Sequence, residues 1–247
     1  MLEWIFVTGQ PGSGELRDRN AVALTSFSHK TISVLLRGAG KTTAVKKMVD
    51  FLQKHGKVCQ GFYTDEVREN GERIGFDVVT VPDGKRGILA RKSPKFKSKF
   101  KTGNYFVDVE SFEKLAIPSL TISSETDNNS QEIVFVLDEI GRMELHSSAF
   151  CDAVEALLNC QGARLVGAVT APRYGHRVPF CDRVTAQEGV QVHNLTKKTR
   201  EQVTLDLLDY IQTHWIDEIP EVSSTAEIND QLTKSSTVAT NDHMTKS

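Results

Sequence analysis

The stretch 4-WIFVTGQPGSG-14 is an apolar run that leads into closely spaced glycines, and 41-KTTAVKKMVDFLQKHG-56 starts with Lys-Thr-Thr and continues with a helical apolar period. Between them lies 15-ELRDRNAVALTSFSHKTISVLLRGAG-40, which has no clear helical or strand period. Joined directly, the outer segments give a strand, the pattern GxxxxGKT, an amphipathic helix and a glycine stop, which is typical of a phosphate-binding loop. Neither the strand nor the helix depends on where the junction is placed, so their agreement indicates one loop interrupted by residues 15–40.

This loop predicts a nucleotide site. In such loops backbone N–H groups surround the phosphates at a helix N-terminus, the lysine reaches the terminal phosphates and the following hydroxyl ligates Mg²⁺. Removal of residues 14–39 leaves the same joined sequence, so Gly40 is equivalent to Gly14. Lys41 has a predicted catalytic role as well, and Thr42 is a predicted magnesium ligand. The predicted nucleotide-binding residues are Gly9, Gln10, Pro11, Gly12, Ser13, Gly14, Gly40, Lys41, Thr42 and Thr43.

The interruption has two interpretations that the sequence leaves open. In the first, residues 15–40 are an in-frame insertion, a retained intron or a gene-model error, and they sever the row of N–H donors. In the second, 32-ISVLLRGAGKTT-43 supplies a replacement strand, although Leu35 stands where the first glycine belongs. Closing the extra loop costs only roughly a few kcal/mol, so the severed donors are the greater damage. We therefore expect the full chain to bind nucleotide poorly or not at all.

The rest of the chain alternates short β-branched runs with helical patterns. This alternation predicts an α/β fold with a mostly parallel sheet flanked by helices. Predicted helices are residues 42–55, with Gly56 as the stop signal, and residues 197–215, capped by Thr196. The predicted strands are 4-WIFVT-8, 58-VCQGFYT-64, 133-IVFVLD-138, 164-RLVGAVT-170 and 190-VQVHNL-195.

A different pattern follows the second strand. The segments 73-RIGFDVVTV-81 and 104-NYFVDV-109 predict a small antiparallel β-excursion, with a turn at 82-PDGKRG-87. The basic segment 91-RKSPKFKSKFK-101 is either a solvated loop or one that contacts phosphate or nucleic acid, and nothing in the sequence decides between these.

Two adjacent acids supply the second half of a hydrolytic site. In 133-IVFVLDEIGRMEL-145 an apolar strand ends in Asp138 and Glu139. Asp138 is the predicted magnesium ligand, and Glu139 is the predicted catalytic residue that polarises the attacking water. Arg142 is a possible cationic stabiliser of the γ-phosphate, with a surface salt bridge as the alternative, and Asn194 is a possible contact to the nucleobase.

The bulk properties set wider limits. A formal net charge of −2, from 30 basic and 32 acidic residues, gives no general attraction to nucleic acid or membrane. Four cysteines without CxxC spacing favour reduced thiols, and no signal peptide or membrane span is evident. We expect a cytoplasmic, soluble monomer. Residues 1–215 are the predicted domain and residues 216–247 a disordered tail.

Several segments together resemble the cancer-related nucleoside-triphosphatase family, whose relatives include small thermophilic bacterial and archaeal NTPases. They are VTGQPGSG with KTT, 61-GFYTDEVRENGERIGFDVVT-80, 103-GNYFVDVESFEKLAIPSL-120, 134-VFVLDEIGRMEL-145 and 194-NLTKKTR-200. The resemblance covers most of residues 2–215, except for the interruption. It implies a RecA-like P-loop fold and magnesium-dependent hydrolysis of ATP, GTP and other nucleoside triphosphates. It also implies that the loop residues, Asp138 and Glu139 have the roles given above.

Two alternatives of other classes stay open. A P-loop kinase of nucleosides or metabolites would share the phosphate loop and would need a lid, for which 85-KRGILARK-92 is the candidate. The other alternative is a catalytically inert nucleotide-binding isoform, produced by the interruption.

Overall fold

The computed structural model describes residues 3–8, 40–93, 96, 98–121, 132–160, 163–170 and 176–217, and for residues 3–8 it gives the backbone. Part of the predicted phosphate loop therefore lies outside the described residues. These are Gly9, Gln10, Pro11, Gly12, Ser13 and Gly14, together with nearly all of the interruption. The polar run 122–131 and residues 218–247, which contain most of the predicted tail, also lie outside.

Five parallel strands form one half of the nine-stranded sheet that the described residues build. Each neighbouring pair among these five is parallel, as the sequence predicted. Across the sheet they are β2 (Val58–Glu69), β7 (Ile133–Ile140), β8 (Arg164–Val169), β1 (Glu3–Thr8) and β9 (Val190–Asn194).

Antiparallel strands continue the sheet beyond β2. They follow in the order β3 (Glu72–Val81), β4 (Arg86–Arg91), β6 (Tyr105–Val107) and β5 (Lys101–Thr102). The predicted excursion is confirmed, and its turn lies between β3 and β4 at residues 82–85 rather than 82–87, because β4 begins at Arg86. Strand β4, which pairs directly with β3, was not predicted from the sequence. Most of the segment 85–92, the lid candidate of the kinase alternative, is therefore a strand of the sheet.

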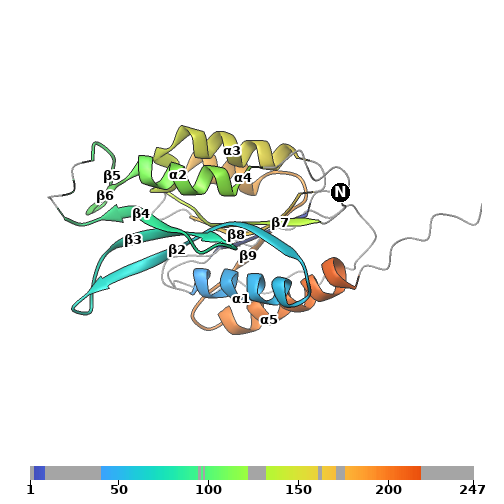
Figure 1. The fold of residues 1–247 in the computed structure, drawn as a ribbon. Coiled ribbons are helices and arrows are strands. Elements are labelled where there is room, and N and C mark those ends of the chain that lie inside the picture. The colour runs from blue at the N-terminus through green and yellow to red at the C-terminus, as the bar shows by residue number, and fades with distance from the viewer. Residues whose placement is uncertain are drawn as a thin grey trace, which may run out of the picture.

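Helices cover both faces of this sheet (Figure 1). One face carries α2 (Val109–Ser119), α3 (Ser148–Asn159) and α4 (Pro179–Thr185), and the other carries α1 (Lys41–Lys54) and α5 (Arg200–Ile211). A short 3₁₀ helix, η2 (Glu144–His146), follows β7, and a π-helical turn, η3 (Gln212–Ile216), extends α5. The α/β fold class is confirmed.

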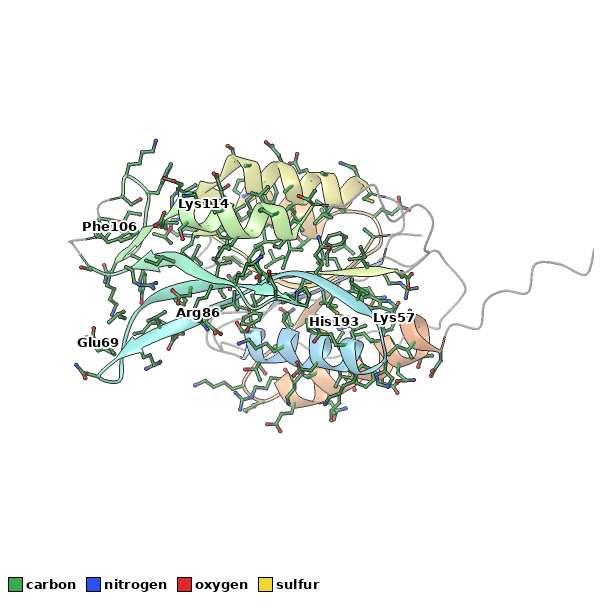
Figure 2. The ribbon with its side chains drawn as sticks, in the orientation of Figure 1. Lys57, Glu69, Arg86, Phe106, Lys114 and His193 are labelled. Atoms are coloured by element: carbon green, nitrogen blue, oxygen red, sulfur yellow. The ribbon has the colours of Figure 1, made fainter. Side chains whose placement is uncertain are left out.

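Two hydrophobic cores correspond to the two faces. The core under α2, α3 and α4 contains Phe62, Phe112 and Phe150, whose ring centroids lie 5.3–5.8 Å apart. The core under α1 and α5 contains Met48 and Trp215. Charged side chains such as Lys114 on α2 and Glu69 at the β2–β3 hairpin project away from both cores (Figure 2).

Strand β7 lies between these cores, and its side chains alternate between them. Val134 and Val136 belong to the core under α1, whereas Phe135 and Leu137 belong to the core under α2 and α3. A strand buried on both faces requires a continuous apolar run, and for this reason β7 could be predicted from the sequence.

Helix α1 begins and ends as predicted. Gly40 precedes it with φ of 87°, in the left-handed region that favours glycine, and its carbonyl accepts a hydrogen bond from the Ala44 N–H. Gly56 follows the helix with φ of 76°, which matches its predicted role as the stop signal.

Local hydrogen bonds explain two of the boundaries that differ from prediction. Helix α5 begins at Arg200 rather than residue 197, because the Thr196 hydroxyl accepts hydrogen bonds from the N–H groups of Lys198 and Thr199 and forms a separate turn. The predicted strand 104–109 ends at Val107, because the Asp108 side chain accepts from the Ser111 N–H and caps α2. Among the described helices, none is long and apolar enough to cross a lipid bilayer.

Candidate active site

Asp138 lies near the carboxyl end of β7, paired with Tyr63 and Ala168, and its side chain is fully buried. Neither carboxylate oxygen has a hydrogen-bond partner of normal geometry among the described residues. Burial raises the pKa of Asp138, while the nearby Thr42 hydroxyl and Lys41 ammonium oppose this rise. Burying an unpaired carboxylate costs free energy, and a bound cation would offset that cost.

The ligands around Asp138 fit magnesium. Mg²⁺ takes oxygen ligands and is usually held by one or two protein oxygens together with phosphate oxygens and water. Asp138 offers two carboxylate oxygens without partners, next to the hydroxyl of Thr42. The described residues contain no group of three or more His, Cys, Asp or Glu side chains that could hold a metal without a further ligand. The predicted pair of Thr42 and Asp138 thus lies together.

Glu139 is held by two side chains from other elements. The Lys41 ammonium donates to Oε2 of Glu139, and the Thr170 hydroxyl, just after β8, donates to Oε1. The side chains of Lys41 and Glu139 are 10% and 25% exposed, so the pair is shielded without being closed to solvent. The predicted catalytic residues are therefore in direct contact.

An irregularity in β7 explains how two consecutive acids serve one site. Val136 faces α1, so Asp138 faces α1 as well, next to Thr42. The pairing of β7 with β8 shifts between Asp138 and Ile140, and Ile140 packs in the opposite core from Val136. A bulge of this kind redirects a side chain, and here it leaves Glu139 beside Lys41.

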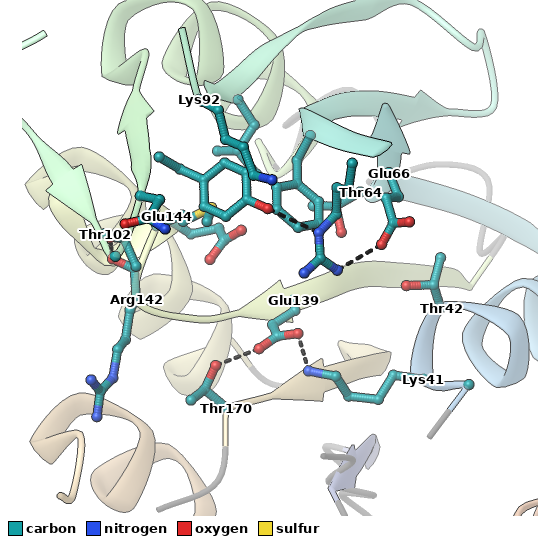
Figure 3. A pocket seen from close by; sticks show the side chains of 18 of the residues that line it. Lys41, Thr42, Thr64, Glu66, Lys92, Thr102, Glu139, Arg142, Glu144 and Thr170 are labelled. Carbon is teal, nitrogen blue, oxygen red and sulfur yellow. Dashed lines mark hydrogen bonds and ion pairs between the residues drawn. The ribbon is translucent and has the colours of Figure 1, made fainter. Parts of the chain in front are cut away.

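Lys41, Thr42, Glu139 and Thr170 line one cavity of about 750 Å³ (Figure 3), and Asp138 is not among its described lining residues. One end contains the start of α1 with the ends of β7 and β8, and the other contains residues of the antiparallel strands. A volume of this size is typical of small-molecule sites. The lining residues include Gly40, Lys41, Thr42, Thr43, Thr64, Glu139, Arg142, Glu144 and Thr170, with Glu66, Arg73, Phe76, Lys92 and Tyr105 at the far end.

Comparisons with known proteins show the family of the chain. A family model described as NTPase matches residues 36–208. The chain belongs to this NTPase family.

Relatives of this NTPase are similar along most of their own length. The human cancer-related nucleoside-triphosphatase is 38% identical over 179 residues, covering 71% of this chain and 93% of that protein. Nucleoside-triphosphatase THEP1 of Thermotoga petrophila is 37% identical over 171 residues, covering 69% of this chain and 86% of that protein.

Two solved structures share the fold of this NTPase. The solution structure of a human cancer-related nucleoside triphosphatase has a TM-score of 0.64 at 36% identity, covering 75% of this chain and 98% of that one. The crystal structure of THEP1 from Aquifex aeolicus has a TM-score of 0.61 at 32% identity, covering 74% of this chain and 97% of that one. The P-loop fold expected from the sequence is thus confirmed.

Of the two possible site residues, Arg142 lines the cavity and Asn194 does not. Arg142 lines the cavity rim, and its guanidinium donates to the His176 carbonyl at 3.4 Å (Figure 3 shows it directed away from Glu139). Asn194 ends β9 opposite Thr8, the last described residue before Gly9, and is not among the described residues that line the cavity.

Sequence reasoning missed two residues of the NTPase site. Thr170 was assigned only to a strand, although its position at the carboxyl end of a parallel strand marks it as a site candidate. Glu144 follows Met143 in the quoted segment and is buried, 5% exposed. A Cβ added to Gly141 would lie 2.8 Å from Glu144 Oε2 and 2.9 Å from Thr170 Oγ1, so both oxygens lie next to Gly141. Burial raises the pKa of Glu144 to about 7.

Proposed function

We propose that this chain hydrolyses nucleoside triphosphates to the diphosphate and phosphate at the Lys41–Glu139 site, with Mg²⁺ as cofactor. One observation carries the proposal: Lys41 and Glu139, separated by 98 positions, are in contact beside the buried Asp138, where Thr42 also lies. NTPase family membership supports the same reaction. The proposed domain remains 1–215, with the interruption at 15–40.

The residues divide the chemistry as follows. The Lys41 ammonium would bind the β- and γ-phosphate oxygens and stabilise charge that develops there. Glu139 would orient a water and accept its proton as the water oxygen bonds to the γ-phosphorus and the bond to the bridging oxygen breaks. Thr170 would hold the Glu139 carboxylate in position. Thr42 and Asp138 would hold magnesium, which when bound neutralises phosphate charge.

The kinase alternative loses its lid candidate. Its lid candidate is strand β4, where Arg86 donates to Asp77 at 3.1 Å and to Asp65 at 2.5 Å. Arg91 donates to Asp77 at 2.5 Å. These arginines are engaged within the sheet rather than available to close over a phosphate.

The inert-isoform alternative keeps one specific support, the separation of Gly9–Gly14 from Lys41 in the sequence. It concerns the activity of the full chain rather than the chemistry of the site. A variant lacking residues 15–40 restores GxxxxGKT and separates the two questions.

Phosphate release tests the proposal. We expect the variant lacking residues 15–40 to release phosphate from ATP or GTP with Mg²⁺ and no acceptor present, and Lys41→Ala in that background to abolish release. Lys47→Ala, which removes an exposed lysine from the same helix, is the matched control and should retain activity. Retained turnover in Lys41→Ala would remove this mechanism.

A further inference from the structure

The cavity extends beyond the hydrolytic groups to a set of rings and cations on the antiparallel strands. We call this part the ring end, and it comprises Arg73 and Phe76 of β3, Lys92 after β4, and Tyr105 of β6. None of these residues has a role in the proposed hydrolysis.

Arg73 is held in one orientation. Its Nε donates to the Tyr105 hydroxyl at 2.9 Å and its Nη1 donates to Glu66 at 2.8 Å. Its guanidinium carbon lies 5.4 Å from the Phe76 ring centroid and 6.0 Å from that of Tyr105. Within the described part of the chain, Nη2 donates to nothing, so one edge of a fixed guanidinium remains available to a ligand.

The ring end carries an excess of positive charge. Glu66 pairs with Arg68 as well as Arg73, so one carboxylate serves two arginines. The Lys92 ammonium lies 5.9 Å from the Tyr105 ring centroid, and no carboxylate pairs with it among the described residues. An anion would therefore be attracted to this part of the cavity.

The nucleoside of the triphosphate lies elsewhere under the proposed function. A triphosphate bound at the N-terminus of α1 with its γ-phosphate at Glu139 would extend its nucleoside away from Glu139. Arg200 of α5 borders the start of α1, with its Cδ 3.6 Å from where a Cβ on Gly40 would be. No described lining residue of the cavity comes from β9 or α5.

We propose that the ring end binds a second ligand, an anion that carries a flat ring, which is the chemistry of a nucleoside monophosphate. The base would lie against Phe76 and Tyr105, and the phosphate would bind Lys92 and the available edge of Arg73. Only the placement of this ligand beyond the γ-phosphate rests on the proposed function, because the ring end itself does not include Lys41 or Glu139.

Calorimetric titration of the full chain with AMP, GMP, CMP and UMP tests this site. We expect saturable binding of at least one of them, weakened about tenfold by Lys92→Gln and by Arg73→Lys, through loss of a hydrogen bond to a charged group. Lys92 is exposed, so its substitution does not threaten the fold. Lys99→Gln, an exposed cation beside Phe100 and outside the lining, should leave the affinity unchanged.

Lys41→Ala separates this proposal from the hydrolytic one. It removes phosphate release but should leave monophosphate binding within twofold, since Lys41 belongs to the other end of the cavity. Absence of saturable binding by all four monophosphates would overturn the second site. Loss of binding in Lys41→Ala, with Lys92→Gln unaffected, would overturn it as well, because the monophosphate would then occupy the phosphate loop.

Discussion

The ammonium of Lys41 donates a hydrogen bond to the carboxylate of Glu139, and this contact joins the start of α1 to the end of β7. Each group neutralises the other while no nucleotide is bound. Under the proposed function, Lys41 would turn to phosphate and Glu139 would turn to water, so the ion pair would have to open first. The pair would then hold both groups in place and compete with the substrate.

Glu139→Gln separates these two effects. We expect the variant lacking residues 15–40 to lose phosphate release by about a hundredfold or more with this substitution, because the water loses its base. Nucleotide affinity should rise, because Lys41 no longer pairs with a carboxylate. Stopped turnover with tighter ATP binding, measured by titration, is the expected combination. Weaker binding in Glu139→Gln would show that the carboxylate does not compete with nucleotide.

The buried Asp138 predicts a conflict between stability and function. Its carboxylate has no hydrogen-bond partner of normal geometry among the described residues. Asp138→Asn should raise the free energy of unfolding at pH 8 without magnesium by about 1–3 kcal/mol, because it removes a buried charge. Urea denaturation measures this change. Asp152→Asn, at an exposed position of α3, is the control and should change stability by less than about 0.5 kcal/mol. A destabilised Asp138→Asn would mean that the charge is compensated.

The adjacent acids could be predicted because the pattern that identifies them is local. The apolar run of β7 and the two acids after it occupy one short segment, and the Lys-Thr-Thr before α1 is equally compact. Thr170, Glu144 and Arg73 were not identified in this way. The strand that ends at Thr170 was predicted, but which strand ends meet at one edge of the sheet is set by pairing between segments far apart in sequence.

Strand β4 was missed for a related reason. The segment 86–91 contains Arg86 and Arg91, which read as surface charges in the sequence. In the structure Asp77 accepts from both arginines, so the charges are balanced by a residue of the neighbouring strand. Tertiary pairing thus overrides the local polarity of this segment.

Glu144 predicts a pH dependence of stability. Burial raises its pKa from 4.5 to about 7. A carboxyl whose pKa rises on folding binds its proton more tightly in the native state, so its contribution is present at low pH and is lost as pH rises from about 4.5 to 7. The loss attributable to Glu144 is up to about 3 kcal/mol.

Glu144→Gln removes this titration. We expect the free energy of unfolding to fall less between pH 5 and pH 8 in Glu144→Gln than in the parent chain, as measured by urea denaturation at both values. Glu155→Gln, at a half-exposed position on α3, should keep the parent's dependence. Identical pH profiles for Glu144→Gln and the parent would show that Glu144 titrates normally.

Gly61 predicts a steric limit in the middle of the sheet. It pairs with Val136 where β2 and β7 run in parallel, and its φ is 140°. A Cβ at Gly61 would lie 2.1 Å from the Val136 carbonyl oxygen. We expect Gly61→Ala to lower the free energy of unfolding by about 3 kcal/mol, since the two backbones must separate.

Gly71→Ala is the matched control for that substitution. Gly71 also has a positive φ, of 79°, but a Cβ there meets no atom within 4 Å. Gly71→Ala should lower the free energy of unfolding by only about 1 kcal/mol, through backbone strain. Equal losses in the two variants would assign the effect at Gly61 to backbone conformation alone.

The interruption at residues 15–40 predicts a difference in nucleotide binding between two forms of the chain. The full chain separates the glycines at 9–14 from Lys41, whereas the form lacking 15–40 restores GxxxxGKT. Ligand present at 100 times its Kd stabilises the native state by about 2.7 kcal/mol. We expect Mg-ATP to raise the melting temperature of the shortened form by several degrees and to leave that of the full chain nearly unchanged. Lys41→Ala in the shortened form should abolish the rise. An equal rise in both forms would instead indicate that the segment ending in Gly38–Thr43 forms a working loop with its own strand.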